Sequence, residues 1–530
     1  MSSLSGRYHA AHPASLAEGW QLERLTRPSR LFGANGMRTG ADGRVYVAQV
    51  AGSQVSAIDI DSGEVETISP LGGDIVGPDD LAFDSAGNLY ATEITRGLVS
   101  VRTPRGDYRV VNGDMPCANP ITMHNDRLIA GECRVGGRIM ELDRDSGEAR
   151  VILADVPMPN AFEVGPDGKL YFPVMGANEI WRVDLDGGAP EVVATGLGVP
   201  DSVKFDSQGF IVSTQVASGQ VLRIDPRTGE QTVLANIAPG LDNCTFVGDR
   251  LFVSSISGDV NEIVAPGEFR PLVPGGLQWP LDIAVGAGGE LFVVDGGFTY
   301  TLQPGGELQL AGMLFSPGFP GYCRGAVASG PGEWLVTTAN GQLARFRPAA
   351  SESEFLADGF DQLMGVALTS GGIPVFAEFG TGRLLATEAG GVRELAGGLD
   401  QPKGVAVDGD ACFVAEAGAG RVVRIAGGRR DTVVDGLGQP EGIAFDGKTL
   451  YVLDIASQSL FAVDPASGAR RELANGLPVG APEGVVRKQL GGVGDMCGPM
   501  GNFTGIAVAP DGVIYVCGDA EGSVLALHPA

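Results

Sequence analysis

The chain has few of the residues that carry transition-metal, disulfide or nucleic-acid chemistry. Of its 530 residues only four are His and seven are Cys, and no two cysteines have C-x-x-C spacing. The scattered, odd number of cysteines favours reduced thiols over a disulfide framework. Positive charge is also scarce, with 37 Lys and Arg against 64 Asp and Glu. The resulting net charge of -27 excludes nucleic acid as a partner, because phosphate binding needs a basic surface.

Long apolar runs and several catalytic motifs are missing as well. No apolar run reaches about eighteen residues, so we expect no membrane span. Residues 1–20 have no apolar core of the kind that signal peptides carry, and together with reduced thiols this predicts a cytoplasmic protein. No G-x-S-x-G, H-E-x-x-H or Walker sequence occurs, which argues against serine hydrolases of that type, zinc proteases and NTPases.

Glycine and proline, by contrast, are abundant and mark a repeat. The 82 Gly and 33 Pro fall at turns between short apolar segments. Similar segments return along the whole chain, for example GPDDLAFDSAGNLYATE at 77–93, VPDSVKFDSQGFIVSTQ at 199–215 and QPEGIAFDGKTLYVLD at 439–454. Repeats of about 40 residues that contain several short strands are typical of β-propeller blades.

One position in each repeat, directly after a Pro-like residue, opens the innermost strand of the blade, and we call it the marker position. Marker positions lie about 40 residues apart, except for a wider interval before the last. They are Asn35, Asp79, Asn119, Asn160, Asp201, Asp242, Leu281, Arg324, Met364, Lys403, Glu441 and Thr504. The sequence therefore predicts an all-β fold of two tandem six-bladed β-propellers, twelve blades in all, with domains at 1–265 and 266–530.

The last blade ends the chain without an outer strand, so another segment must close its ring. WQLERL at 20–25 and EFRPLV at 268–273 both precede a first blade. We expect the first to complete blade 6 and the second to complete blade 12; in the alternative, blade 12 joins the N-terminal ring. The wide interval holds a Gly-rich insertion at about 477–503. We expect it over the mouth of the second ring, as a lid or as a surface loop.

The six markers of the first ring are all Asp or Asn, whereas those of the second are chemically mixed. Capping of backbone N–H groups in a turn explains Asp or Asn at any single position. Six of them at one channel mouth favour a cation site, because converging carboxylates repel one another without a cation. Oxygen donors are the ligands that Ca²⁺ and Mg²⁺ prefer. The second strand of each blade returns to the same mouth, which adds Glu93, Glu132 and Gln215.

At these residues the first half resembles the gluconolactonase/senescence-marker-protein (regucalcin-like) family of six-bladed propellers. MPNAFEVGPDGKLYFPV carries Asn160, VPDSVKFD carries Asp201 and CANPITM carries Asn119. The resemblance covers about 30–265, and the second half shares only the general repeat. It implies a divalent metal in the channel, Ca²⁺ ahead of Mg²⁺, Mn²⁺ or Zn²⁺. The metal ligands it implies here are Asn160, Asp201 and, at the blade 1 position, Asn35. We add Asp242 as a further candidate ligand from the same ring of markers.

Two positions depart from the family pattern. Asn35 stands where the family has Glu, which removes one negative charge from the ligand set, and Cys117 stands where it has a substrate-binding Arg. The resemblance implies a metal-dependent hydrolase that acts on a small lactone or ester. The catalytic candidates are Asp201, Asp79 and Glu132. The candidates for contact with the substrate are Asn119, Cys117, Glu93 and Gln215.

Two other classes of function stay open. A lyase or isomerase could use the same metal, and a non-catalytic tandem propeller could serve as a binding scaffold with a protein partner. The second ring offers Arg324, Lys403 and Glu441 at its mouth. Opposite charges in a narrow mouth pair with one another most simply, and a site for an organic anion is the alternative.

Overall fold

The computed structural model describes residues 7–8, 12–303, 305–388 and 390–530 of the chain. Over these ranges the protein is built of short antiparallel strands, with two single 3₁₀ turns, η1 (Met175–Ala177) and η2 (Pro348–Ala350), and no α-helix. No described helix is long and apolar enough to span a bilayer. The predicted all-β propeller fold is confirmed.

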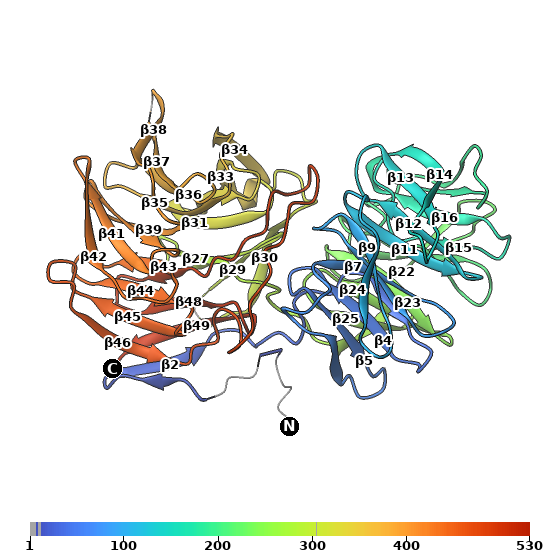
Figure 1. Ribbon diagram of the computed structural model, residues 1–530, viewed down its shortest axis with the longest axis horizontal. Helices are drawn as coiled ribbons and strands as arrows, with labels where there is room; N and C mark the ends of the chain where they lie inside the picture. Colours follow the sequence, from blue (N-terminus) through green and yellow to red (C-terminus); the bar gives the residue numbers. More distant parts are fainter. Residues whose placement is uncertain (1–6, 9–11, 304, 389) are drawn as a thin grey trace. The chain divides into compact units, whose positions relative to one another are not determined.

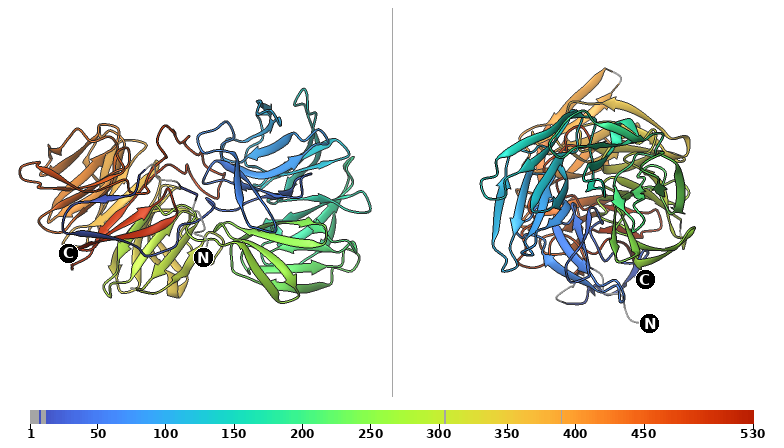
Figure 2. Two further views of the ribbon diagram at one scale, coloured as in Figure 1. Left: turned by 90° about the horizontal axis from the view of Figure 1, so that it is seen from below. Right: turned by 90° about the vertical axis from the view of Figure 1, so that its right-hand side faces the viewer.

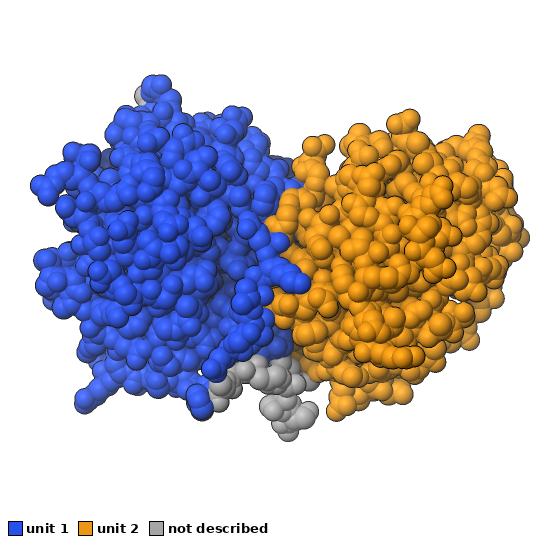
Figure 3. All heavy atoms as spheres, in the orientation of Figure 1, with its two compact units in different colours: residues 1–29, 279–489, 496–530 blue, residues 30–278, 490–495 orange. Residues whose placement is uncertain are grey.

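The chain divides into two compact units, coloured separately in Figure 3. Unit 1 comprises residues 1–29, 279–489 and 496–530, and unit 2 comprises residues 30–278 and 490–495. Among the described residues each unit contains six antiparallel sheets, and in most of them the four strands follow one another in chain order. Such sheets are the blades of a propeller.

The sheets of unit 2 run from the innermost strand outward. They are β3 (Met37–Thr39), β4 (Val45–Gln49), β5 (Gln54–Ile58) and β6 (Val65–Ser69); β7 (Pro78–Phe83), β8 (Leu89–Glu93), β9 (Leu98–Arg102) and β10 (Tyr108–Asn112); β11 (Ala118–His124), β12 (Arg127–Glu132), β13 (Gly137–Leu142) and β14 (Ala149–Val156). The other three are β15 (Glu163–Val164), β16 (Leu170–Val174), β17 (Glu179–Val183) and β18 (Glu191–Ala194); β19 (Lys204–Phe205), β20 (Ile211–Thr214), β21 (Gln220–Ile224) and β22 (Gln231–Asn236); β23 (Leu241–Val247), β24 (Arg250–Ser255), β25 (Val260–Ala265) and β26 (Glu268–Val273).

The sheets of unit 1 follow the same plan. The first four are β27 (Asp282–Val285), β28 (Leu291–Asp295), β29 (Phe298–Leu302) and β30 (Leu308–Met313); β31 (Cys323–Gly330), β32 (Glu333–Thr338), β33 (Leu343–Arg347) and β34 (Glu352–Ala357); β35 (Leu363–Leu368), β36 (Pro374–Glu378), β37 (Arg383–Glu388) and β38 (Gly391–Ala396); β39 (Pro402–Asp408), β40 (Ala411–Glu416), β41 (Arg421–Ala426) and β42 (Arg429–Val434). The last two are β43 (Pro440–Phe445), β44 (Leu450–Asp454), β45 (Ser459–Val463) and β46 (Arg470–Asn475) with β1 (Ser15–Leu16) at the edge; and β47 (Ile506–Val508), β48 (Ile514–Gly518), β49 (Ser523–Pro529) and β2 (Trp20–Arg24).

Apolar layers between neighbouring sheets hold each unit together. Phe172 and Phe162 of the fourth sheet pack with Ile129 of the third, and the first and sixth sheets of unit 2 share a layer that contains Val45 and Phe252. In unit 1 the backbone N–H of Gly505 donates to the carbonyl of Leu281 over 2.7 Å, which joins the last sheet to the first. In both units the sixth sheet therefore returns to the first.

Our expectation for the closing strands is wrong in both rings. Strand β2 pairs with β49, from Trp20 opposite Pro529 to Arg24 opposite Leu525, so 20–25 completes the last sheet of unit 1. Figures 1 and 2 show this blue strand among the orange and red strands. Strand β26 pairs with β25 and completes the sixth sheet of unit 2. The alternative, in which blade 12 joins the N-terminal ring, is also incorrect, because β47–β49 lie in unit 1.

The reason is loop length. Only two residues separate β25 from β26, so this hairpin forms at little entropic cost and leaves no free edge in unit 2. In the last sheet β2 pairs with β49 and so covers the edge that this strand would otherwise expose. The division into units accordingly differs from the predicted domains 1–265 and 266–530, since residues 1–29 lie with unit 1.

A β-bulge positions many of the marker residues. The pairing of the innermost strand with its neighbour shifts register between Pro78 and Leu81, around Asp79, and again between Leu241 and Cys244, around Asp242. The same shift occurs around Asn119, Arg324, Met364, Lys403 and Glu441. A bulge re-aims a side chain out of the alternating strand pattern, and here it recurs where the channel opens.

The Gly-rich insertion lies partly where it was expected. Residues 480–487 and Asn502 line a cavity of unit 1, and a Cβ at Gly501 would lie 3.4 Å from Arg324 Nη2. Residues 490–495, however, belong to unit 2, where a Cβ at Gly494 would lie 3.0 Å from Cys117 Sγ. Only part of the insertion therefore covers the mouth of the C-terminal ring.

Candidate functional site

Two Asn–Asp pairs lie at the channel mouth of unit 2. The amide nitrogen of Asn160 donates to Oδ2 of Asp201 over 2.9 Å, and that of Asn35 donates to Oδ2 of Asp242 over 3.1 Å. All four side chains are buried. The amide oxygens are held by the backbone, since Asn160 Oδ1 accepts from the N–H of Ala161 and Asn35 Oδ1 accepts from that of Val50. The residues predicted as metal ligands are thus brought together in two pairs.

The carboxyl groups at this mouth interact electrostatically. Burial, and then the charge of Asp80, raises the pKa of Asp79 to about 8. Burial, followed by the charges of Asp242 and Asp79, raises the pKa of Asp201 well above its usual value. The pKa of Asp242 is also raised well above its usual value, by burial and by Asp79, although the hydrogen bond from Asn35 opposes the shift. Each group favours its protonated form because like charges share a dry site.

Within the described ranges, no Lys, Arg or His forms an ion pair with Asp79, Asp201 or Asp242. Three buried carboxyls without a basic partner need protons or a cation to remain buried. No three His, Cys, Asp or Glu side chains of the described chain lie close enough together to hold one ion. A cation would therefore have to combine the carboxylates with the amides of Asn35 and Asn160. This all-oxygen donor set fits a hard divalent cation by its chemistry.

The residues at the ends of the second strands have a structural task. Glu93 Oε2 accepts the backbone N–H of Val76 over 2.9 Å, and Gln215 Oε1 accepts that of Gly198 over 2.9 Å. Gln49 does the same for Phe32, and in unit 1 Glu416 does so for Asp400. These side chains thus fasten the loop that leads into the innermost strand. Glu93 and Gln215, which were predicted to contact substrate, are fully buried and make these hydrogen bonds to the backbone.

Glu132 is bound by two arginines. Arg134 lies 3.0 Å from Glu132 Oε2, and Arg138 Nε donates to Oε1 over 3.0 Å. Burial acts to raise the pKa of Glu132, but the bonds from Arg138 and Arg134 outweigh it and leave the pKa below its usual value. A carboxylate held by two guanidinium groups is a weak base. This geometry argues against the catalytic role predicted for Glu132.

Cys117 lies directly before β11, the innermost strand of the third sheet, and Asn119 lies within that strand. Asn119 is buried at the marker position, and its carbonyl accepts a hydrogen bond from Thr92 over 2.6 Å. Cys117 is buried with a positive φ of 55°, and burial is the largest cause that raises the pKa of its thiol. At neutral pH Cys117 is therefore an uncharged group, unlike the Arg that the family resemblance implies at this position.

Two sets of residues were missed by the sequence reasoning. Asp80 directly follows a marker, and its Oδ1 and Oδ2 accept the backbone N–H groups of Leu81 and Ile121 at 2.8 and 3.3 Å, which links two inner strands. Thr92 adds to this link, because its hydroxyl accepts from the N–H of Asp80 and donates to the carbonyl of Asn119. The doubled Asp in PDD was the available signal for Asp80.

The second missed set lies three residues beyond the markers on the inner strands. Lys204 Nζ lies 3.0 Å from Glu163 Oε2, and Arg38 Nη1 lies 3.3 Å from the same oxygen. These charged side chains line a cavity of about 430 Å³ together with Phe83, Phe205 and Phe246. Arg38 also donates to the carbonyls of Leu81 and Ile121, so this charge cluster ties inner strands together.

Comparison with known proteins bears on unit 2. Residues 23–257 match the model of the family described as SMP-30/Gluconolactonase/LRE-like region. No curated protein matches the chain by sequence. Among solved structures, virginiamycin B lyase from Staphylococcus aureus is similar at 17% identity and a TM-score of 0.38, covering 54% of this chain and 95% of that one. A protein proposed to be a gluconolactonase is similar at 18% identity and a TM-score of 0.39, covering 50% of this chain and 98% of that one.

The family match and the marker residues agree on the same part of the chain, because Asn35, Asn160, Asp201 and Asp242 all lie within the matched range. Residues 23–257, which hold the six marker residues of unit 2, are therefore similar to the SMP-30/gluconolactonase/LRE-like family.

Proposed function

We propose that the N-terminal propeller is a metal-dependent hydrolase that acts on a small lactone or ester at its channel mouth. The observation that carries the proposal is the group of three buried carboxyls, Asp79, Asp201 and Asp242, without a basic partner in the described chain. A structural role does not require such a group, because an apolar or hydrogen-bonded residue would avoid the repulsion. The family match over residues 23–257 agrees with lactone chemistry.

The cation would be held by Asn35, Asn160, Asp201 and Asp242, all buried at the mouth. Their oxygen donors favour Ca²⁺, with Mg²⁺, Mn²⁺ and Zn²⁺ as alternatives. When bound, such an ion acts as a Lewis acid that polarises a carbonyl oxygen. The ligand amides would have to turn, because the amide nitrogens now face Asp201 and Asp242.

Proton transfer falls to the remaining carboxyl. Asp79, with a pKa near 8, can hold a proton at Oδ1 or Oδ2 at neutral pH and release it without a large cost. In its ionised form it can take a proton from an attacking water, and in its protonated form it can donate one to the leaving oxygen. Asp201 is the second candidate base or nucleophile, for a state in which its proton has been lost.

The groups around the mouth favour an uncharged substrate. Cys117 supplies a neutral thiol, and the unpaired acids give the site negative or neutral character. An anionic substrate would be repelled by these carboxylates, whereas a lactone or ester carries no charge. Asn119 can offer its amide to a substrate hydroxyl or carbonyl from the marker position of the third sheet.

A screen of lactones and esters against the full-length protein, with and without a chelator, tests this function. Hydrolysis that a chelator abolishes and that incorporates ¹⁸O from labelled water into the product is the expected result. Product formation without ¹⁸O would indicate a lyase or isomerase at the same site. Absence of turnover with every cation would favour a binding scaffold.

A further inference from the structure

The mouth of the unit 1 channel carries a different set of side chains. Its marker residues include Arg324, Lys403, Glu441 and Thr504, and each of these is buried, with at most 4% of its surface exposed. Bulges in the innermost strands surround the first three, as they do at the unit 2 mouth. The fold therefore directs these three side chains toward the channel opening of this unit, and Thr504 occupies the marker position of the last sheet.

The positive charge of Lys403 is balanced by Glu441. Its Nζ forms an ion pair with Oε1 of Glu441 and donates to the carbonyl of Asn502 over 2.7 Å. Gln439 Nε2 also donates to Glu441 Oε1, over 3.1 Å. The second carboxylate oxygen, Glu441 Oε2, is buried and has no hydrogen-bond partner among the described residues.

Arg324 has no such match. Its Nη2 contacts only the sulfur of Met364, at 3.3 Å, and its Nε and Nη1 are buried without partners in the described chain. A thioether is a weak acceptor, so the guanidinium keeps nearly all of its hydrogen-bonding capacity. A buried charge left without a partner is strongly destabilising, so a purely structural role does not explain Arg324. The hydroxyl of Thr504 is likewise buried and unpartnered.

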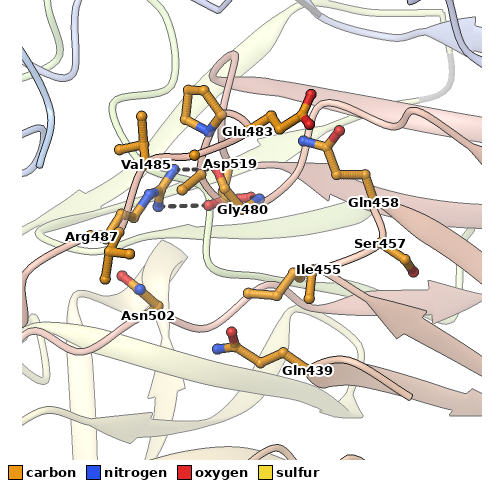
Figure 4. Close-up of a pocket in the computed structure, with 15 residues that line it drawn as sticks. Gln439, Ile455, Ser457, Gln458, Gly480, Glu483, Val485, Arg487, Asn502 and Asp519 are labelled. Carbon is orange, nitrogen blue, oxygen red and sulfur yellow. Dashed lines mark hydrogen bonds and ion pairs between the residues drawn. The ribbon is translucent and has the colours of Figure 1, made fainter. Parts of the chain in front are cut away.

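A cavity of about 570 Å³ in the same unit is lined by two residues that contact this group, although none of the four residues lines it. Gln439 and Asn502, which bond to Glu441 and Lys403, also line the cavity and lie on one side of it in Figure 4, opposite Glu483. Ser457 and Gln458 add further polar groups to the lining. The volume lies within the range of small-molecule sites.

The unpartnered atoms define what would fit. Arg324 offers donors and a positive charge, which an anionic carboxylate matches with two oxygens. Glu441 Oε2 is an acceptor only, so it requires a donor such as a hydroxyl group. The four residues include two cationic side chains and one carboxylate. One positive charge among them is therefore not balanced by the others. One ligand that carries both a carboxylate and hydroxyls satisfies these groups together.

We propose that the C-terminal propeller binds a small hydroxycarboxylate at its channel mouth. Its carboxylate is held by Arg324 and Thr504, one hydroxyl donates to Glu441 Oε2, and the remaining polar groups extend toward Gln439 and Asn502. The inference does not rest on the reaction proposed for the N-terminal propeller. Hydrolysis of a lactone does yield a hydroxycarboxylate, so the product of that reaction falls in the same chemical class.

Calorimetric titration of the full-length protein tests the site, with D-gluconate and glycolate as probes at up to roughly 10 mM, where even a Kd of about 1 mM is measurable. Sorbitol supplies hydroxyls without charge, and chloride supplies charge without hydroxyls. We expect saturable binding of at least one hydroxycarboxylate and weaker or no binding of sorbitol and chloride. If neither hydroxycarboxylate binds, or if sorbitol or chloride binds equally well, the proposal is wrong.

Three variants locate the binding. Arg324→Met should weaken binding roughly 30-fold or more, because it removes the charged partner of a buried carboxylate. Arg429→Met, at an exposed arginine of the same unit, should leave binding unchanged. Unchanged binding by a folded Arg324→Met protein would overturn the proposal, as would an equal loss of binding in Arg429→Met. If Arg324→Met does not fold, Thr504→Val serves in its place, and it too must weaken binding.

Discussion

Asn160 donates a hydrogen bond to Asp201 over 2.9 Å, although the two residues lie 41 positions apart and on neighbouring blades. The same relation joins Asn35 and Asp242 across the seam where the first and sixth sheets of unit 2 meet. Each pair combines an amide with a carboxyl whose pKa is raised by burial. The propeller thus brings one polar side chain per blade to a common mouth and leaves their charges to be balanced there.

Stability without a cation should fall as the pH rises. The pKa of Asp79 is 3.8 in an unfolded chain and about 8 in the folded protein, so the folded state binds the proton more tightly. The stabilisation from this proton is complete below about pH 4 and is lost as the pH rises through about 8. We expect the Tm in a chelator to decrease between about pH 5 and about pH 8.

Asp79→Asn provides the control for this prediction, because an amide does not titrate. Its Tm should depend less on pH than that of the wild type over the same window. Saturating Ca²⁺ should also flatten the profile, since a bound cation favours the ionised carboxyls. A wild-type Tm that rises with pH in the chelator would contradict the burial of protonated carboxyls.

Glu132→Gln separates a structural from a catalytic role. The ion pairs with Arg134 and Arg138 hold the third blade, and both arginines are partly exposed. Loss of these two ion pairs in Glu132→Gln should reduce the free energy of unfolding by on the order of 1–2 kcal/mol. The value of kcat/KM should stay close to that of the wild type. Chemical denaturation and steady-state kinetics on the same preparation measure both quantities. A large fall in kcat without loss of stability would restore Glu132 as a catalytic candidate.

The hydroxyl of Thr92 should matter for the mouth although it is fully buried. Thr92→Val removes a group that bonds both to the N–H of Asp80 and to the carbonyl of Asn119. Leaving these buried backbone groups without a partner should cost about 2 kcal/mol of stability. Thr92→Ser keeps the hydroxyl and should recover most of that loss. Equal stability of the two variants would show that the hydrogen bonds contribute little.

Removal of the N-terminal strand should damage unit 1 and spare unit 2. A protein that begins at residue 27 lacks β1 and β2, so β49 is left with an unpaired edge and without the packing of Trp20 and Leu22. We expect unit 1 to lose roughly 3 kcal/mol or more. A synthetic peptide of residues 12–26 should restore the lost stability. Unchanged hydrogen exchange in β49 after the truncation would contradict the observed pairing.

The repeat was readable in the sequence because each blade is a local unit. The hairpins between successive strands are short, and the marker after a Pro-like residue recurs at a fixed place in each blade. This is why the repeat pattern alone could place residues such as Asp201 and Asn160 at one mouth. The bulges that aim several other markers there leave no distinct residue pattern of their own.

Long-range partners were not readable in the same way. The pairing of Trp20 with Pro529 joins opposite ends of the chain, and nothing in either segment specifies the other. The hydrogen bond of Glu93 was not readable either, because a carboxylate at the end of a strand has the same sequence signal whether it faces the channel or accepts the N–H of Val76. Direction of a side chain at a strand end depends on the neighbouring loop, which the repeat pattern does not describe.

The most direct test of the account is the metal content of the purified protein, measured by inductively coupled plasma analysis beside the activity of the same sample. We expect one tightly bound divalent ion per chain, and Asp201→Ala should lose the ion together with roughly 100-fold or more of any hydrolytic activity. Arg324→Met should keep the ion, because its side chain lies in the other unit. A wild-type protein that holds no ion and gains neither stability nor activity from Ca²⁺, Mg²⁺, Mn²⁺ or Zn²⁺ would contradict the proposed metal-dependent hydrolase.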